Sequence, residues 1–185
     1  MRRIMLVDDE PNVLNALRRL LTAHDTIEPT KWNLAVEAFE SPVAALARAE
    51  KGVPFDLVIS DYRMAEMDGV GFLRRFREIQ PDAVRLILSG YADLDGLVGA
   101  INEAQIYRFI AKPWNDYELK AAVAQALAHK ELLSENQRLA DEVRAQQGII
   151  SRQELELRRL EAESPGITKV HWGPNGEVIL DDESL

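Results

Sequence analysis

The sequence has 185 residues, of which 46% are hydrophobic and 29% charged, an ordinary composition for one globular domain with an extension. Its net charge of −9 argues against direct binding to nucleic acid, which needs clustered cations, and no apolar run reaches the roughly 18 residues of a membrane helix. The absence of cysteine excludes disulfides and thiolate metal sites and fits a reducing cytoplasm. From charge, hydropathy and cysteine content together, we expect a cytoplasmic protein that contacts neither DNA nor membrane.

The first part of the chain alternates short apolar runs with segments of helical periodicity. Residues 3–7 form an apolar run that ends at Asp8 and Asp9, and Pro11 then stands at a helix start. Further strands are predicted over residues 34–39, 55–60, 84–88 and 107–111, and further helices from Ser41, over 70–76 and over 94–104. This alternation predicts an α/β fold, in which a five-stranded, doubly wound parallel sheet is covered by helices on both faces.

Polar residues stand where four of these strands end. Asp8 and Asp9 follow the first strand, and Asp61, Ser89 and Lys112 follow the third, fourth and fifth. Because the carboxyl ends of parallel strands meet along one edge, near a topological switch point, we expect these side chains in a common pocket. Clustered carboxylates repel one another unless a cation lies among them, and oxygen ligands suit Mg²⁺, which also holds phosphoryl groups. An aspartate in such a pocket has the chemistry of a phosphoryl-accepting nucleophile.

Several short motifs at these positions carry a resemblance to a known family. They are Asp8-Asp9, Ser60-Asp61-Tyr62-Arg63-Met64, Asp68-Gly69, Leu88-Ser89-Gly90-Tyr91-Ala92-Asp93 and Lys112-Pro113-Trp114. Over residues 1–125 the sequence resembles the CheY-like receiver domain of bacterial two-component response regulators. Its details are similar to the receivers of HD-GYP phosphodiesterases and NtrC-like activators. The resemblance implies a flavodoxin-like sheet and a phosphoprotein that acts in a phosphorelay.

The resemblance also implies a role for each matched residue. Asp61 would accept a phosphoryl group from a sensor histidine kinase, and Lys112 and Ser89 would contact the phosphoryl oxygens. Ser89 and Phe109 would form the conformational switch, although the family often has Thr and Tyr at these positions. Mg²⁺, or Mn²⁺ in its place, would be bound by Asp9, Asp61 and the backbone carbonyl of Arg63, and Asp8 would complete the metal site largely through metal-bound water.

The composition changes after Pro113. Between Asn115 and Ala162 there is no proline, and core-tolerated residues recur at alternating spacings of three and four, which is typical of a coiled coil. An Asn at an a position favours a parallel two-stranded register, so we expect a parallel homodimer; a solvated single helix is the alternative. The predicted dimer seam consists of Leu132, Asn136, Leu139, Val143, Ile150, Leu157 and Leu160.

The last residues read as a separate tail. Ser164-Pro165-Gly166 is expected to stop the helix, and Gly173-Pro174-Asn175-Gly176 suits the turn of a β-hairpin. Trp172 either anchors a partner protein or packs onto the chain itself. We therefore predict three segments, which are a phosphoacceptor receiver domain (1–125), a coiled-coil dimerisation helix (126–163) and a tail with a β-hairpin (164–185).

These patterns predict a response regulator that is not an enzyme and signals through its coiled coil and tail to a protein partner. One alternative is a truncated receiver module of a cyclic-di-nucleotide phosphodiesterase or a transcriptional regulator. The initial Met and the acidic C-terminus lead us to expect a stand-alone regulator instead. Another alternative is a phosphatase of the haloacid-dehalogenase type, which needs two aspartates separated by one residue after its first strand. Asp8 and Asp9 are adjacent, and Asp61 follows the third strand.

Overall fold

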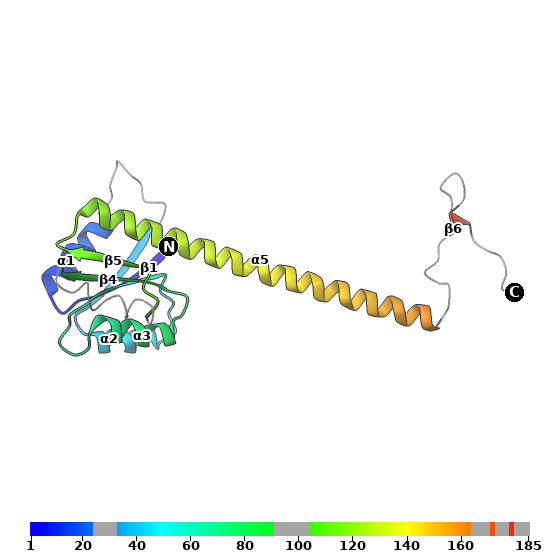
Figure 1. Ribbon diagram of the computed structural model, residues 1–185, viewed down its shortest axis with the longest axis horizontal. Coiled ribbons are helices and arrows are strands. Elements are labelled where there is room, and N and C mark those ends of the chain that lie inside the picture. The colour runs from blue at the N-terminus through cyan, green and yellow to red at the C-terminus, as the bar shows by residue number, and fades with distance from the viewer. Residues whose placement is uncertain (24–32, 91–103, 164–170, 173–177, 180–185) are drawn as a thin grey trace. The chain divides into compact units, whose positions relative to one another are not determined.

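The computed structural model describes residues 1–23, 33–90, 104–163, 171–172 and 178–179 (Figure 1). The contacts within the chain divide it into two units, Met1–Ser134 and Glu135–Leu185. Within the described ranges, no helix has an apolar stretch long enough to span a bilayer. The first unit contains the main sheet and the predicted site.

A five-stranded parallel sheet forms the centre of the first unit, with the strand order β2-β1-β3-β4-β5. Its strands are β1 (Arg2–Val7), β2 (Leu34–Phe39), β3 (Leu57–Asp61), β4 (Val84–Gly90) and β5 (Arg108–Lys112). The chain moves outward from β1 to β2 and then crosses back to β3, so the switch point lies between β1 and β3. The predicted doubly wound α/β fold is confirmed.

Helices cover both faces of this sheet (Figure 1). One core cluster joins the sheet to α1 (Pro11–Thr22) and to the first turns of α5 (Asp116–Glu163), and the other joins it to α2 (Pro42–Ala49) and α3 (Gly69–Ile79). Strand β3 is buried throughout, β4 up to Ser89 and β1 from Ile4 onward, as expected for central strands covered on both sides. The predicted helix over 94–104 lies outside the described residues except for Ala104.

The third strand begins two residues later than the sequence pattern predicts. The amide of Phe55 donates a hydrogen bond to the side-chain oxygen of Gln80 at 2.8 Å instead of to a neighbouring strand. The Gln80 side-chain amide in turn donates to the carbonyls of Ala49, at 3.1 Å, and Val53, at 2.9 Å. Gln80 thus fastens the loop that precedes β3 to the end of α3.

Helix α5 is one continuous helix of 48 residues. The side-chain oxygen of Asn115 caps its start by accepting hydrogen bonds from the amides of Tyr117, at 2.9 Å, and Glu118, at 3.2 Å. Its early turns contribute to the core of the first unit through Leu119, Ala122, Val123, Ala126 and Leu127. His129 stacks on Tyr107, with ring centroids 4.9 Å apart.

In the second unit, two short strands of the tail pair with each other. β6 (His171–Trp172) runs antiparallel to β7 (Val178–Ile179), and Trp172 pairs with Val178. The other tail residues, including the predicted turn, lie outside the described residues, and so does the side chain of Trp172.

Replacing Gln80 by Ala is expected to lower the free energy of unfolding by about 2–4 kcal/mol, because three backbone groups lose their partner. Denaturant unfolding of the full chain measures the change. Gln125→Ala, at an exposed position of α5, is the matched control and should alter stability by less than about 0.5 kcal/mol. Equal stability of the two variants would contradict the proposed fastening.

Candidate functional site

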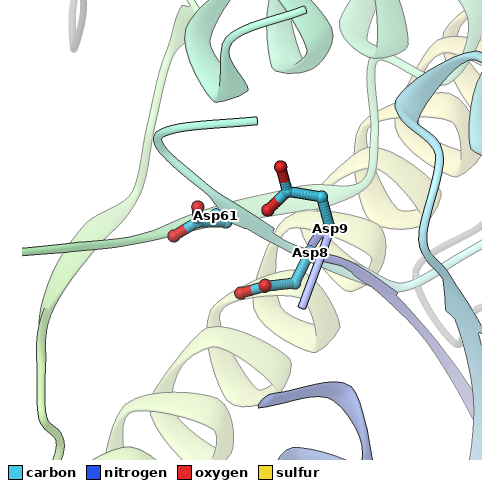
Figure 2. A group of neighbouring side chains, drawn as sticks. All are labelled: Asp8, Asp9 and Asp61. Atoms are coloured by element: carbon cyan, nitrogen blue, oxygen red, sulfur yellow. The ribbon is translucent and has the colours of Figure 1, made fainter. Parts of the chain in front are cut away.

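Three carboxylates gather at the carboxyl ends of β1 and β3 (Figure 2). Asp8, Asp9 and Asp61 each offer an oxygen atom, and these atoms all lie within 4.8 Å of one another. The sheet register explains the meeting, because Val7 of β1 pairs with Ser60 of β3 and the aspartates come next on both strands. The structure therefore brings together the residues that the strand-end pattern singles out.

Two of the three carboxylates are buried. Asp8 is 0% exposed and Asp61 is 6% exposed, whereas Asp9 is open to solvent. Burial raises the pKa of the Asp61 carboxyl above its usual value, and the attraction of Lys112 only partly offsets this effect. A cation bound near Asp61 would therefore favour the charged form of its carboxyl.

Lys112, at the end of β5, supplies a positive charge to both buried carboxylates. Its Nζ atom lies 2.7 Å from Oδ2 of Asp8 and 2.6 Å from Oδ1 of Asp61. Burial opposes the charge on Lys112, yet the hydrogen bonds to the two carboxylates outweigh it and raise the pKa of the ammonium. Lys112 therefore stays charged and sits directly against the oxygen of Asp61.

Backbone amides hold the second oxygen of the buried carboxylates. The amide of Arg63 donates to Oδ2 of Asp61 at 3.1 Å, and that of Glu10 donates to Oδ1 of Asp8 at 2.9 Å. The sequence pattern did not reveal these donors, because every residue type except proline carries the same amide. They restrict the rotation of each carboxylate and leave both side chains aimed at the pocket.

Gly69 allows the chain to pass close to the acceptor position. A Cβ atom built on Gly69 would lie 2.0 Å from the backbone oxygen of Asp61, well inside any allowed contact. The amide of Gly69 also donates to the carbonyl of Tyr62 at 2.8 Å, which draws the start of α3 against the end of β3. Only glycine fits here, since the obstructing atom is backbone.

The two predicted switch residues lie on adjacent strands. Ser89 is 1% exposed, and its hydroxyl donates to the carbonyl of Gly90 at 3.3 Å. Asp61 pairs with Leu88 in the sheet register, so Ser89 stands one residue further along the same edge. Phe109, on β5, is half-buried and packs against the core cluster on the α2 and α3 side.

The predicted dimer seam lies on the later turns of α5, and its described side chains are exposed. The exposed fraction is 64% for Leu132, 45% for Leu139 and 51% for Val143. Asn136, Leu157 and Leu160 are exposed as well, and the side chain of Ile150 lies outside the described residues. An apolar row on a helix surface remains available for a partner.

The donor set of the pocket fits a hard divalent cation. Its three carboxylates offer oxygen ligands alone, the combination that Mg²⁺ prefers. The residues within the described ranges that converge there include neither His nor Cys, so the set differs from the nitrogen and sulfur ligands of zinc sites.

Comparison with known proteins identifies the family. The model of the response regulator receiver domain matches residues 4–124. The chain belongs to this family. The predicted resemblance is thereby confirmed, and receiver domains of this family are phosphorylated on an aspartate.

Relatives of the receiver domain occur in larger regulators. Hydrogenase transcriptional regulatory protein HoxA of Bradyrhizobium diazoefficiens is 35% identical over 80% of this chain and 29% of HoxA. A receiver domain of an HD domain-containing protein from Pseudomonas fluorescens is 34% identical, with a TM-score of 0.63 over 72% of this chain and 92% of that one. The predicted similarity to receivers of these two kinds of regulator is confirmed.

A further solved structure, described as adenylate cyclase from Rhodopirellula baltica, is 34% identical to this chain. It has a TM-score of 0.66 and covers 76% of this chain and 97% of its own. The chain spans 26–32% of the length of the curated transcriptional regulators to which it is similar. The likeness therefore covers only part of the length of those regulators.

Replacing Gly69 by Ala is expected to lower the free energy of unfolding by about 1–3 kcal/mol, because the new Cβ overlaps the backbone of Asp61. Denaturant unfolding measures the loss. In the control variant Gly148→Ala, the added methyl group meets nothing within 4 Å, so stability should stay constant or rise by up to about 1 kcal/mol. If both variants were as stable as the wild type, the close approach of Gly69 would not be a real constraint.

Proposed function

We propose that this receiver domain accepts a phosphoryl group on Asp61 from a sensor histidine kinase in the cytoplasm, with Mg²⁺ or Mn²⁺ bound. One observation carries the proposal. The Asp61 carboxylate lies beside two further carboxylates and is held at 2.6 Å by the Lys112 ammonium. The metal would be held by Asp8, Asp9, Asp61 and the backbone carbonyl of Arg63, and it would neutralise charge on the phosphoryl oxygens.

In this transfer, an Asp61 oxygen attacks the phosphorus of phosphohistidine. A new bond joins that oxygen to phosphorus, while the bond between phosphorus and the histidine nitrogen breaks and its electron pair returns to the imidazole. Lys112 then contacts a phosphoryl oxygen and compensates the added negative charge. Ser89 supplies a further hydrogen bond from the neighbouring strand. The domain itself catalyses nothing beyond this single transfer.

We further propose that Ser89 and Phe109 transmit the modification. When the hydroxyl of Ser89 turns from the carbonyl of Gly90 toward the phosphoryl group, it vacates space on the β4 edge. Phe109 is the register partner of Ile87 on β4. Its side chain is only half-buried, so its ring has room to repack. Phosphorylation would then shift a population between two packings, as in other switches.

The output is proposed to pass through a parallel homodimer of α5 and the tail to a downstream protein. The exposed leucines of the seam support this, because a long helix rarely persists without burying an apolar face. Exposed ion pairs along the helix, such as Arg138 with Glu135 and Arg144 with Asp141, favour helix formation but bury nothing.

A second candidate function is that of an input module in a longer transcriptional regulator or cyclic-di-nucleotide phosphodiesterase. The names of the relatives favour it, since HoxA is a transcriptional regulatory protein and the Pseudomonas receiver comes from an HD domain-containing protein. The reading frame of the gene beyond Leu185 separates the two candidates. A DNA-binding or HD domain in that frame would support the second.

The phosphoacceptor assignment predicts that Asp61→Asn abolishes labelling by acetyl phosphate in the presence of Mg²⁺. Intact-protein mass spectrometry should show one added phosphoryl group on the wild type and none on the variant. Asp82→Asn changes an exposed aspartate at the start of the α3–β4 turn and should be labelled like the wild type. Labelling of the Asp61→Asn variant would overturn the assignment.

The seam predicts that Leu139→Ala weakens the dimer by about thirtyfold or more. Replacing a buried Leu by Ala costs about 2–5 kcal/mol of free energy, which here would be lost from dimerisation. Sedimentation equilibrium measures the association. Leu155 is 72% exposed and lies outside the predicted seam, so Leu155→Ala should dimerise like the wild type. A wild-type protein that stays monomeric at high concentration, with or without phosphorylation, would refute the dimer.

A further inference from the structure

We infer that Tyr107 is an autoinhibitory clamp on α5. Its ring, stacked on His129, keeps His129 out of the dimer seam, so that the coiled coil begins at Leu132. The inference rests on the proposed dimer and names the contact that limits the length of its seam. It is carried by one aromatic pair and by the hydrogen bonds and packing that hold both rings in place.

His129 belongs to the seam pattern by its spacing. It lies seven residues before Asn136 and three before Leu132 on one continuous helix, so its side chain would face the partner helix in a parallel dimer. In the structure this ring instead stacks on Tyr107, with centroids 4.9 Å apart and planes inclined by 25°, a favourable geometry for an aromatic pair. Tyr107 therefore lies on the seam side of the helix at this level, and a partner helix could contact His129 only after the stack opens.

Tyr107 is held firmly, because the turn before it is tied to β4. The amide of Tyr107 donates to the carbonyl of Arg85 at 2.8 Å. Arg85 is 6% exposed, and its guanidinium donates to the carbonyls of Ala104, at 2.9 Å, and Gln105, at 3.3 Å. Gln105 has a φ of 49°, which is uncommon for a residue with a side chain and persists where its surroundings hold it. The buried arginine thus fixes the turn that presents Tyr107 to α5.

The helix side of the stack is fixed as well. Ala126 and Leu127 are 0% and 1% exposed and pack into the core cluster shared with α1. Lys130 lines a hollow beside Asp82, which lies just before β4. His129 stands between these packed residues, so the first unit holds this turn of α5 against the start of β5. Opening the stack therefore requires the His129 ring to move away from a fixed partner.

Disulfide cross-linking can map where the seam begins, because the chain has no cysteine of its own and a disulfide forms only between closely apposed positions. Gln125 is exposed and lies seven residues before Leu132, so it would join the seam only if the seam extended past His129. Val143→Cys lies inside the seam and is the positive control. In the presence of Tyr107, Gln125→Cys should cross-link under a mild oxidant much more slowly than Val143→Cys.

Tyr107→Ala removes the stacking ring, whereas Tyr107→Phe keeps it and is the matched control. Loss of one aromatic pair should raise the rate of cross-linking through Gln125→Cys by about two- to tenfold. The rate in the Tyr107→Phe background should equal that in the wild-type background. Equal rates in the Ala and Phe backgrounds would overturn the clamp, while cross-linking through Val143→Cys would still support the dimer.

Denaturant unfolding of the same proteins shows whether their fold is intact. Tyr107→Leu keeps an apolar side chain but cannot stack, so it takes the place of Tyr107→Ala if that variant unfolds, with the same expected increase. Equally fast cross-linking through Gln125→Cys and Val143→Cys in the wild-type background would show that the seam already passes His129, and would overturn the clamp alone. No cross-linking through Val143→Cys in any background would overturn the proposed dimer and this inference with it.

Discussion

The repulsion among three aspartates at one edge of the sheet is the constraint on which the rest of the site depends. Asp8 and Asp61 are buried, so water screens their charges poorly, and the energy of two nearby negative charges is high. Lys112 bridges the two buried carboxylates, at 2.7 Å and 2.6 Å, and backbone amides take up their remaining oxygens. Even so, burial still raises the pKa of Asp61. A pocket with three carboxylates and one ammonium retains excess negative charge, and that excess would favour binding of a divalent cation.

The scaffold holds this arrangement by its topology rather than by local sequence. Residues far apart in the chain meet because β1 and β3 are neighbours at the point where the strand order reverses. Gly69 lets the start of α3 approach the acceptor strand, and two core clusters press the helices against both faces. Because the pocket lies at strand ends, a small movement of an adjacent strand changes its geometry. Such a site is suited to couple the proposed phosphorylation of Asp61 to a conformational change.

The sequence predicted the parts of this structure that depend on residue type. Apolar periodicity located every described strand of the main sheet, and the rule for carboxyl ends placed Asp61 beside Asp8. It did not predict that β3 begins after Phe55, because that boundary depends on where the Gln80 side chain hydrogen-bonds. The amide donors of Glu10 and Arg63 were also hidden, since a backbone group leaves no signature in composition. Nor did the pattern show where α5 leaves the core, because helix packing and a coiled-coil seam share nearly the same spacing of three and four.

This last ambiguity bears on the role of α5. His129 lies seven residues before Asn136, and so at the same position of the heptad, yet its ring stacks on Tyr107. Beyond Ser134 the pattern continues, while Leu139 and Val143 become about half exposed. Exposed ion pairs contribute too little to keep so long a helix formed, so the apolar row needs a surface to cover it. A second copy of α5 offers a row of the same spacing, in which Asn136 would face Asn136 and fix the register. The proposed dimerisation would account for both the length and the composition of this helix.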